Sequence, residues 1–153
     1  IPGVWSSLRW EVAGARKTLD QIEHEILRPL YQEPRIHVAI NCASISCPPL
    51  RFEPYVGESL TRQLILATRD YLASDLGLQV DGSTLRLSSI FDWYGNDFIE
   101  DYAHLVEGGS EKERAVLGLV SAYGPPAAAT LAQSGNVRVR YLRYNWVLND
   151  VED

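Results

Sequence analysis

The first predicted helix rests on apolar positions that recur at helical spacing. Residues 19–27 carry leucine and isoleucine at the intervals of a helix that buries one face. Thr18 and Gln21 have the spacing of a capping box, in which each side chain bonds the other residue's main-chain N–H. Pro29 has no main-chain N–H and is expected to end this helix at about Arg28.

Three further stretches have a helical pattern, and they cover residues 59–73, 111–123 and 127–133. Residues 4–15 are apolar without a clear period, so we expect an irregular or partly extended lead-in.

Strands are predicted where apolar and polar residues alternate. This pattern occurs over residues 35–40 and again over 137–141. Residues 78–87 contain Asp81-Gly82 between two short apolar runs, which predicts a hairpin with a type I′ turn. The sum is an α+β fold with a small, mostly antiparallel sheet and helices packed on one side of it. A fold like that of cysteine peptidases or transglutaminases is one candidate of this class.

Composition limits the classes of protein that fit this pattern. The 153 residues are enough for one domain, and 46% hydrophobic residues is typical of a globular chain. A net charge of −6 disfavours a nucleic-acid partner. The sequence contains no signal peptide and no apolar run long enough to span a membrane. It begins at Ile1 and contains no Met, so a processed or truncated chain is expected, and a periplasmic or secreted location stays open.

The richest source of chemistry is residues 36–50, which hold both cysteines and His37. A cysteine nucleophile needs a lowered thiol pKa, from an imidazole or a helix N-terminus. Cys47 precedes Pro48, so a helix starting there would place Cys47 at its N-cap. His37 or His24 could be the base, with Asn41, Asp97 or Asn149 orienting it. Papain-like and transglutaminase-like enzymes use such a set, although they place the cysteine before the histidine.

Three other interpretations of the cysteines stay open. A Cys42–Cys47 disulfide would close a short loop and contribute only about 2 kcal/mol by the chain-entropy estimate. A metal site would need His24 or His37 to complete the ligands. In the third interpretation Cys42 points into the core from a strand end, and Cys47 packs the loop. No cofactor and no metal are expected.

Four motifs in order resemble the DUF547 family, a family of unknown function found in bacteria and plants. They are Ile22-Glu23-His24, Ile36-His37 through Asn41-Cys42 to Ser46-Cys47-Pro48, Ile90-Phe91-Asp92-Trp93-Tyr94 with Asp97-Phe98, and Tyr144-Asn145-Trp146 with Leu148-Asn149. The resemblance implies one domain over residues 1–153 that lacks the family's usual N-terminal helix.

The other candidate site residues come from the same motifs. Glu23 and His24 are neighbours on a helix and point about 100° apart, so only one of them can face a ligand directly. Trp93, Tyr94, Asp97 and Trp146 are candidates for binding a substrate.

Two functions fit these residues. One is a thiol-dependent hydrolase or acyl transferase acting on a peptide-like or small-molecule substrate, with Cys47 or Cys42 as nucleophile. The other is a non-catalytic interaction or scaffold domain with a structural or redox-labile Cys42–Cys47 pair. The sequence does not indicate the oligomeric state.

Overall fold

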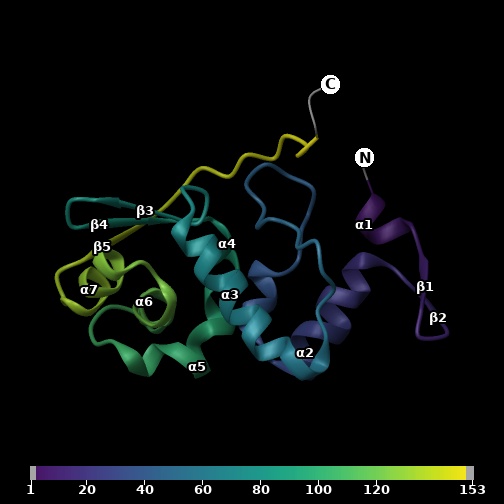
Figure 1. Cartoon of the computed structure of the whole chain (residues 1–153), viewed down its shortest axis with the longest axis horizontal. Helices are drawn as coiled ribbons and strands as arrows, with labels where there is room; N and C mark the ends of the chain where they lie inside the picture. Colours follow the sequence, from purple (N-terminus) through teal and green to yellow (C-terminus); the bar gives the residue numbers. More distant parts are fainter. Residues whose placement is uncertain (1–2, 151–153) are drawn as a thin grey trace. The chain divides into compact units, whose positions relative to one another are not determined.

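The computed structural model describes residues 3–150 and divides the chain into two compact units (Figure 1). The boundary lies between Pro34 and Arg35. The α+β class predicted from the sequence is confirmed. A single domain over residues 1–153, and a fold like that of cysteine peptidases or transglutaminases, stay predictions. Within the described part of the chain, every helix is too short or too polar to cross a membrane.

The first unit is a hairpin followed by a continuous helical stretch. Its elements are α1 (Val4–Ser7), β1 (Trp10–Val12), β2 (Ala15–Lys17), η1 (Gln21–Leu27) and α2 (Arg28–Tyr31). Strands β1 and β2 pair antiparallel, so the expected irregular lead-in includes a short helix and a hairpin.

The capping box is confirmed at the start of the helical stretch. The N–H of Gln21 donates to Thr18 Oγ1 at 3.1 Å, and the N–H of Thr18 donates to Gln21 Oε1 at 3.2 Å. The predicted end at Arg28 is wrong, because the helix continues to Tyr31. The wide π-helical turns of η1 precede Pro29, which therefore occupies the first turn of α2, where proline is tolerated.

Helices predominate in the second unit, which also contains a three-stranded sheet. From the boundary onward the elements are η2 (Pro34–Val38), η3 (Gly57–Ser59), α3 (Leu60–Ala73), β3 (Leu78–Asp81), β4 (Thr84–Leu87), α4 (Ile90–Trp93), η4 (Gly95–Phe98), α5 (Ile99–Tyr102), η5 (Ala103–Leu105), α6 (Glu111–Tyr123), α7 (Pro126–Gln133) and β5 (Arg138–Tyr141). The three helices predicted over 59–73, 111–123 and 127–133 are confirmed as α3, α6 and α7.

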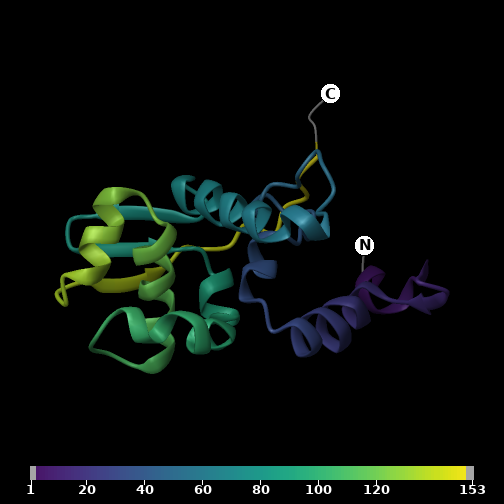
Figure 2. The ribbon, with the colours of Figure 1, turned by 60° about the horizontal axis from the view of Figure 1, so that its bottom comes forward.

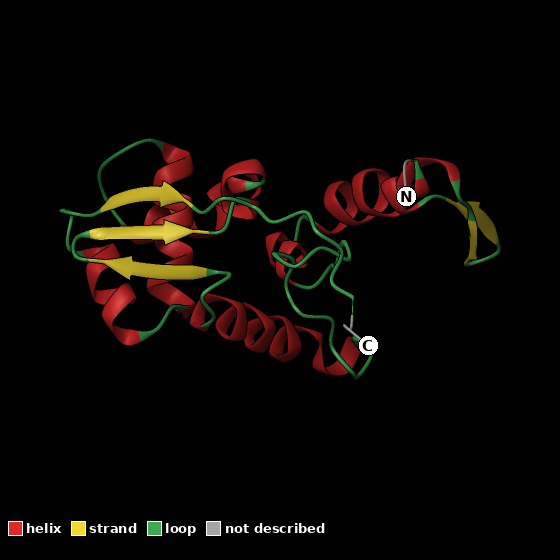
Figure 3. Ribbon diagram, turned by 90° about the horizontal axis from the view of Figure 1, so that it is seen from above, coloured by secondary structure: helices red, strands yellow, loops and turns green. Residues whose placement is uncertain are grey.

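The sheet has the strand order β3-β4-β5, and α6 and α7 lie over one of its faces (Figures 2 and 3). Strands β3 and β4 form the predicted antiparallel hairpin, whereas β5 pairs parallel to β4. The turn is Gly82-Ser83, one residue later than predicted, since Asp81 pairs with Thr84. The predicted type I′ is wrong as well, because of these two residues only Gly82 has a positive φ. Gly82 adopts a φ of 57°, which glycine reaches without a steric penalty.

The core lies between the sheet and the helices. Leu85 and Leu87 of β4 are fully buried, whereas Arg86 between them is exposed, so the sheet buries one face. The largest side chains packed there with them are Tyr71, Leu72, Phe91, Phe98 and Leu119. This layer supports the loops that follow η2 and β5.

The strand predicted over residues 35–40 is wrong, because this segment contains the 3-10 helix η2. The N–H groups of Ala39 and Ile40 both donate to the carbonyl of Ile36 at 2.9 Å, so these residues are bonded locally rather than to a neighbouring strand. The adjacent side chains of His37 and Val38 are both buried. A half-buried strand would expose one of the two.

Candidate functional site

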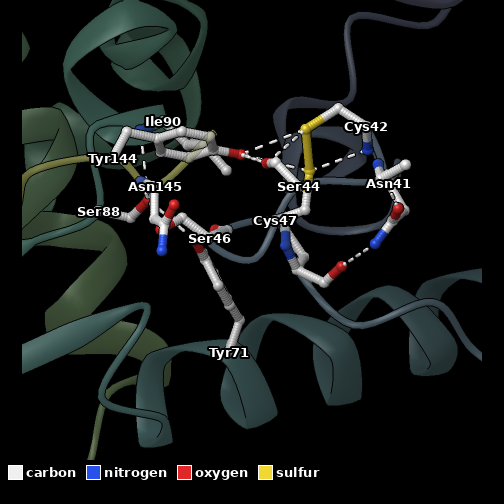
Figure 4. Close-up of a disulfide and its surroundings, with 12 residues drawn as sticks. Asn41, Cys42, Ser44, Ser46, Cys47, Tyr71, Ser88, Ile90, Tyr144 and Asn145 are labelled. Carbon is white, nitrogen blue, oxygen red and sulfur yellow. Dashed lines mark hydrogen bonds between the residues drawn. A yellow bond between two sulfur atoms is a disulfide. The ribbon is translucent and has the colours of Figure 1, made fainter. Parts of the chain in front are cut away.

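Cys42 and Cys47 are joined by a disulfide in an irregular loop of the second unit (Figure 4). Their Cα atoms are 6.1 Å apart, within the range that a disulfide spans. Ala43 has a φ of 60°, a left-handed conformation that is uncommon outside glycine and recurs at functional sites.

Asn41 closes the base of this loop. Its Oδ1 accepts the N–H of Ala43 at 2.7 Å, and its Nδ2 donates to the carbonyl of Pro48 at 2.8 Å. One side chain therefore joins the two ends of the cysteine loop, and a catalytic role for Asn41 stays a prediction.

The segment after β5 pairs with the cysteine loop, although about 100 residues separate them. Ser44 and Leu148 form an antiparallel bridge. On either side of this bridge, the N–H of Ile45 donates to Val147 at 2.9 Å and the N–H of Asn149 donates to Ala43 at 2.8 Å. The loop is thus anchored independently of its disulfide.

Tyr71 of α3 anchors the cysteine loop to the helix. Its hydroxyl donates to the carbonyl of Ser46 at 3.0 Å and lies 2.8 Å from Ser88 Oγ. Burial raises the pKa of Tyr71 to about 12, the hydrogen bond with Ser88 lowers it in part, and Tyr144 adds a smaller increase.

Tyr144 places its hydroxyl against both sulfur atoms (Figure 4). It donates to Cys47 Sγ at 3.2 Å and lies 3.3 Å from Cys42 Sγ, and Ser44 donates to it at 3.2 Å. Burial raises the pKa of Tyr144, and the bond with Ser44 opposes part of that increase. The hydroxyl therefore stays protonated at neutral pH and can donate to sulfur.

A main-chain donor also faces the sulfur of Cys47. The N–H of Cys42 donates to Cys47 Sγ at 2.8 Å. Cys47 is buried, with 5% of its surface exposed, whereas Cys42 is half-buried. The two donors would stabilise negative charge on Cys47 more than on its partner.

Two expectations about the cysteines are therefore wrong. Cys47 is not at a helix N-cap, because residues 48–50 form no helix. Cys42 does not point into the core from a strand end; the more deeply buried residue is Cys47. The donors that face Cys47 come from a main-chain N–H within the loop and from Tyr144, a residue absent from the sequence candidates.

His37 is buried and pairs with Asp97. The distance from His37 Nε2 to Asp97 Oδ2 is 2.8 Å. The imidazole stacks on Tyr94, with 4.0 Å between ring centroids and 15° between planes. The structure thus joins three sequence candidates into one cluster, with Asp97 orienting the imidazole and Tyr94 covering one of its faces.

Trp93 and Trp146 also come together, from α4 and from the segment after β5. Their rings stack with centroids 5.4 Å apart, and the ring of Tyr144 lies within 5 Å of each. Both indoles are exposed, at 47% and 66%. Tyr144 therefore links these exposed indoles to the disulfide.

Glu23 and His24 lie on η1 in the first unit. His24 Nδ1 is 3.2 Å from a guanidinium nitrogen of Arg28 and 4.0 Å from Glu23 Oε1. Within that unit the imidazole is half exposed and Nδ1 accepts from Arg28. A catalytic role for either residue stays a prediction.

The residues that the sequence analysis missed are Tyr144, Ser44 and Tyr71. The only available signal was the Tyr144-Asn145-Trp146 motif, of which Trp146 alone was selected. Among residues 3–150, no three histidine, cysteine or acidic side chains gather as a metal site would require.

Residues 3–72 match the model of DUF547, described as a protein of unknown function. The DUF547 resemblance is thereby confirmed over this segment. It contains both cysteines, His37, Glu23 and His24, whereas Trp93 and Tyr144 lie beyond the part that matches DUF547. No curated protein and no solved structure matches the chain. The DUF547 match names no reaction, so any function has to be argued from the site itself.

Proposed function

We propose that this chain is a thiol-dependent domain that exchanges its Cys42–Cys47 disulfide with the thiols of a peptide-like substrate. The observation that carries the proposal is the pair of donors at Cys47 Sγ, the N–H of Cys42 and the hydroxyl of Tyr144. Thiol–disulfide exchange is fastest when the leaving sulfur is a stabilised thiolate. Cys42, the less buried of the two cysteines, is the one that a substrate reaches.

In the first step, a substrate thiolate attacks Cys42 Sγ. A bond forms between the substrate sulfur and Cys42, the bond between Cys42 and Cys47 breaks, and its electron pair leaves on Cys47. A second substrate thiolate then attacks the mixed disulfide and releases Cys42 as a thiolate. The substrate dithiol is oxidised to a disulfide and the cysteine pair is reduced. The two protons that the substrate thiols release before attack are available to the two new thiolates.

The surroundings of the loop suit a disulfide that opens and closes. The bridge to Leu148 and the bonds made by Asn41 hold the loop in either redox state. The disulfide itself closes a short loop and adds only about 2 kcal/mol by the chain-entropy estimate. A pair used only for stability would contribute little here.

The His37–Asp97 pair favours a second candidate for the reduced protein. An imidazole oriented by Asp97 could serve as general base for a free cysteine thiol, so the reduced form could act as the thiol-dependent hydrolase or acyl transferase expected from the sequence. This candidate requires free thiols, whereas the proposed exchange starts from the disulfide. The two activities can therefore be measured separately.

Trapping of the mixed disulfide tests exchange. In Cys47→Ser, the Cys42 thiolate attacks a peptide disulfide and one peptide sulfur leaves as a thiolate; because Cys47 is absent and cannot resolve the mixed disulfide, a stable adduct should form. The matched variant Cys42→Ser keeps only the buried thiol and should react at least about tenfold more slowly. Mass spectrometry identifies the adduct. Equal and slow reaction of both variants would leave only a structural or scaffold role for the pair.

Hydrolysis is tested separately, with an acyl thioester substrate and the reduced wild-type protein. If the hydrolase candidate is right, the reduced protein should hydrolyse the thioester. Oxidation should abolish this activity, and His37→Ala should lower it. Turnover unaffected by oxidation, or none at all, contradicts it without affecting the exchange proposal.

A further inference from the structure

The ring of Tyr144 packs against two exposed indoles, and the two residues that follow Trp146 in the chain are exposed as well. We call Trp93, Trp146, Val147 and Leu148 the aromatic surface, and their exposed fractions are 47%, 66%, 63% and 61%. Large apolar groups exposed close together mark interaction sites more often than single exposed residues do.

The aromatic surface is continuous with the disulfide through one side chain. The ring of Tyr144 lies 4.8 Å from that of Trp93 and 4.5 Å from that of Trp146, between ring centroids, while its hydroxyl touches both sulfurs. A molecule whose thiol reaches Cys42 can therefore place a neighbouring group on the indoles.

The main chain of Leu148 offers a second kind of contact. The antiparallel bridge directs the hydrogen bonds of Val147 and Asn149 towards the cysteine loop, so those of Leu148 point the other way. Over residues 3–150, neither the N–H nor the carbonyl of Leu148 has a hydrogen-bond partner. Such an unpaired edge is suited to an extended polypeptide, which brings one donor and one acceptor per residue.

Charge indicates which polypeptide fits. The chain carries a net charge of −6. A lysine or arginine in the bound segment would complement this excess of negative charge.

From these observations we infer that the aromatic surface binds an extended, cysteine-containing polypeptide with an aromatic residue close to its cysteine and a basic residue beyond it. This inference rests on the proposed exchange and names the class of substrate for the same disulfide. The aromatic side chain packs on Trp93 and Trp146, the peptide main chain bonds Leu148, and the cysteine reaches Cys42.

Exchange kinetics with synthetic peptides and with dithiothreitol test the inference on the whole chain. A peptide with phenylalanine two residues from cysteine, followed by lysine, should react at least about tenfold more efficiently than its Phe→Ala counterpart, as expected when an aromatic anchor is lost. Trp146→Ala should abolish this preference, so the two peptides should react with it at equal rates. Trp10→Ala, which changes an exposed tryptophan of β1, is the matched control and should preserve both the preference and the rate with dithiothreitol.

The possible outcomes separate the two proposals. If the disulfide oxidises peptides but Trp146→Ala and the phenylalanine have no effect, the substrate class is wrong and exchange stands. If an acidic peptide reacts as well as the basic one, the charge assignment is wrong. If neither peptides nor dithiothreitol react, the proposed exchange itself fails.

Discussion

The hydroxyl of Tyr144 is the only side-chain group in the described structure that donates a hydrogen bond to Cys47 Sγ. A hydrogen bond to a charged atom contributes about 1.5 kcal/mol. Tyr144→Phe keeps the ring against both tryptophans and removes this donor, together with the acceptor of the hydrogen bond from Ser44. We therefore expect peptide exchange to slow about tenfold, measured by stopped-flow fluorescence.

Tyr141→Phe is the control for this substitution, since Tyr141 lies over Lys112 and makes no sulfur contact. It should exchange at the wild-type rate. If Tyr144→Phe exchanges as fast as Tyr141→Phe, the hydroxyl does not stabilise the leaving sulfur, and the N–H of Cys42 would have to do so alone.

At the scale of single residues, the sequence indicated the chemistry better than the geometry. The cysteines, His37 and Asp97 were identified because their side chains are reactive or can orient an imidazole. Their mutual positions were not, because the relative burial of Cys42 and Cys47 depends on a segment about 100 residues away. Tyr144 was missed for the same reason.

Among the elements, the cysteine loop is paired with the segment after β5 and does not depend on its disulfide. Reduction should therefore leave the chain folded and lower its free energy of unfolding by about 2 kcal/mol. Urea denaturation with and without a phosphine reductant measures this difference. In the double variant Cys42→Ser, Cys47→Ser the reductant should make no difference, and unfolding of wild type on reduction would contradict the proposed exchange cycle.

Helix α6 packs so closely on the preceding segment that Gly118 has no room for a side chain. A Cβ at this position would overlap the main-chain carbonyl of Tyr102. Gly118→Ala should lower the free energy of unfolding by about 2 kcal/mol or more. Gly57→Ala is the matched control, because no atom lies within 4 Å of its added Cβ. Equal stabilities would show that the two segments separate easily.

Elements with a long, regular pattern were predicted well, and short ones less well. Helices α3 and α6 each extend over several turns, so their apolar faces are repeated. Residues 35–40 offered only three apolar residues in alternation, a pattern that η2 satisfies with local hydrogen bonds. The parallel pairing of β5 with β4 depends on the helices between them and has no local signal.

In the second unit as a whole, the buried hydroxyl of Tyr71 links the core to the cysteine loop. Its raised pKa makes the free energy of unfolding depend on pH in the alkaline range. Burial raises its pKa to about 12 from the ordinary value of 10.0. Because the folded-state pKa is the higher one, this contribution is fully present below pH 10 and is lost as the pH rises towards 12. At pH 11 the loss is about 1.4 kcal/mol.

Urea denaturation of wild type and Tyr71→Phe at pH 8, 10 and 11 measures this effect, on a background of Cys42→Ser, Cys47→Ser that prevents alkaline exchange. The phenylalanine variant should be less stable at pH 8, because Ser46 and Ser88 lose their partner. Its stability should then fall less steeply than that of wild type. Parallel declines would mean that Tyr71 ionises in the folded chain as it does in water, which requires the core around α3 to admit solvent.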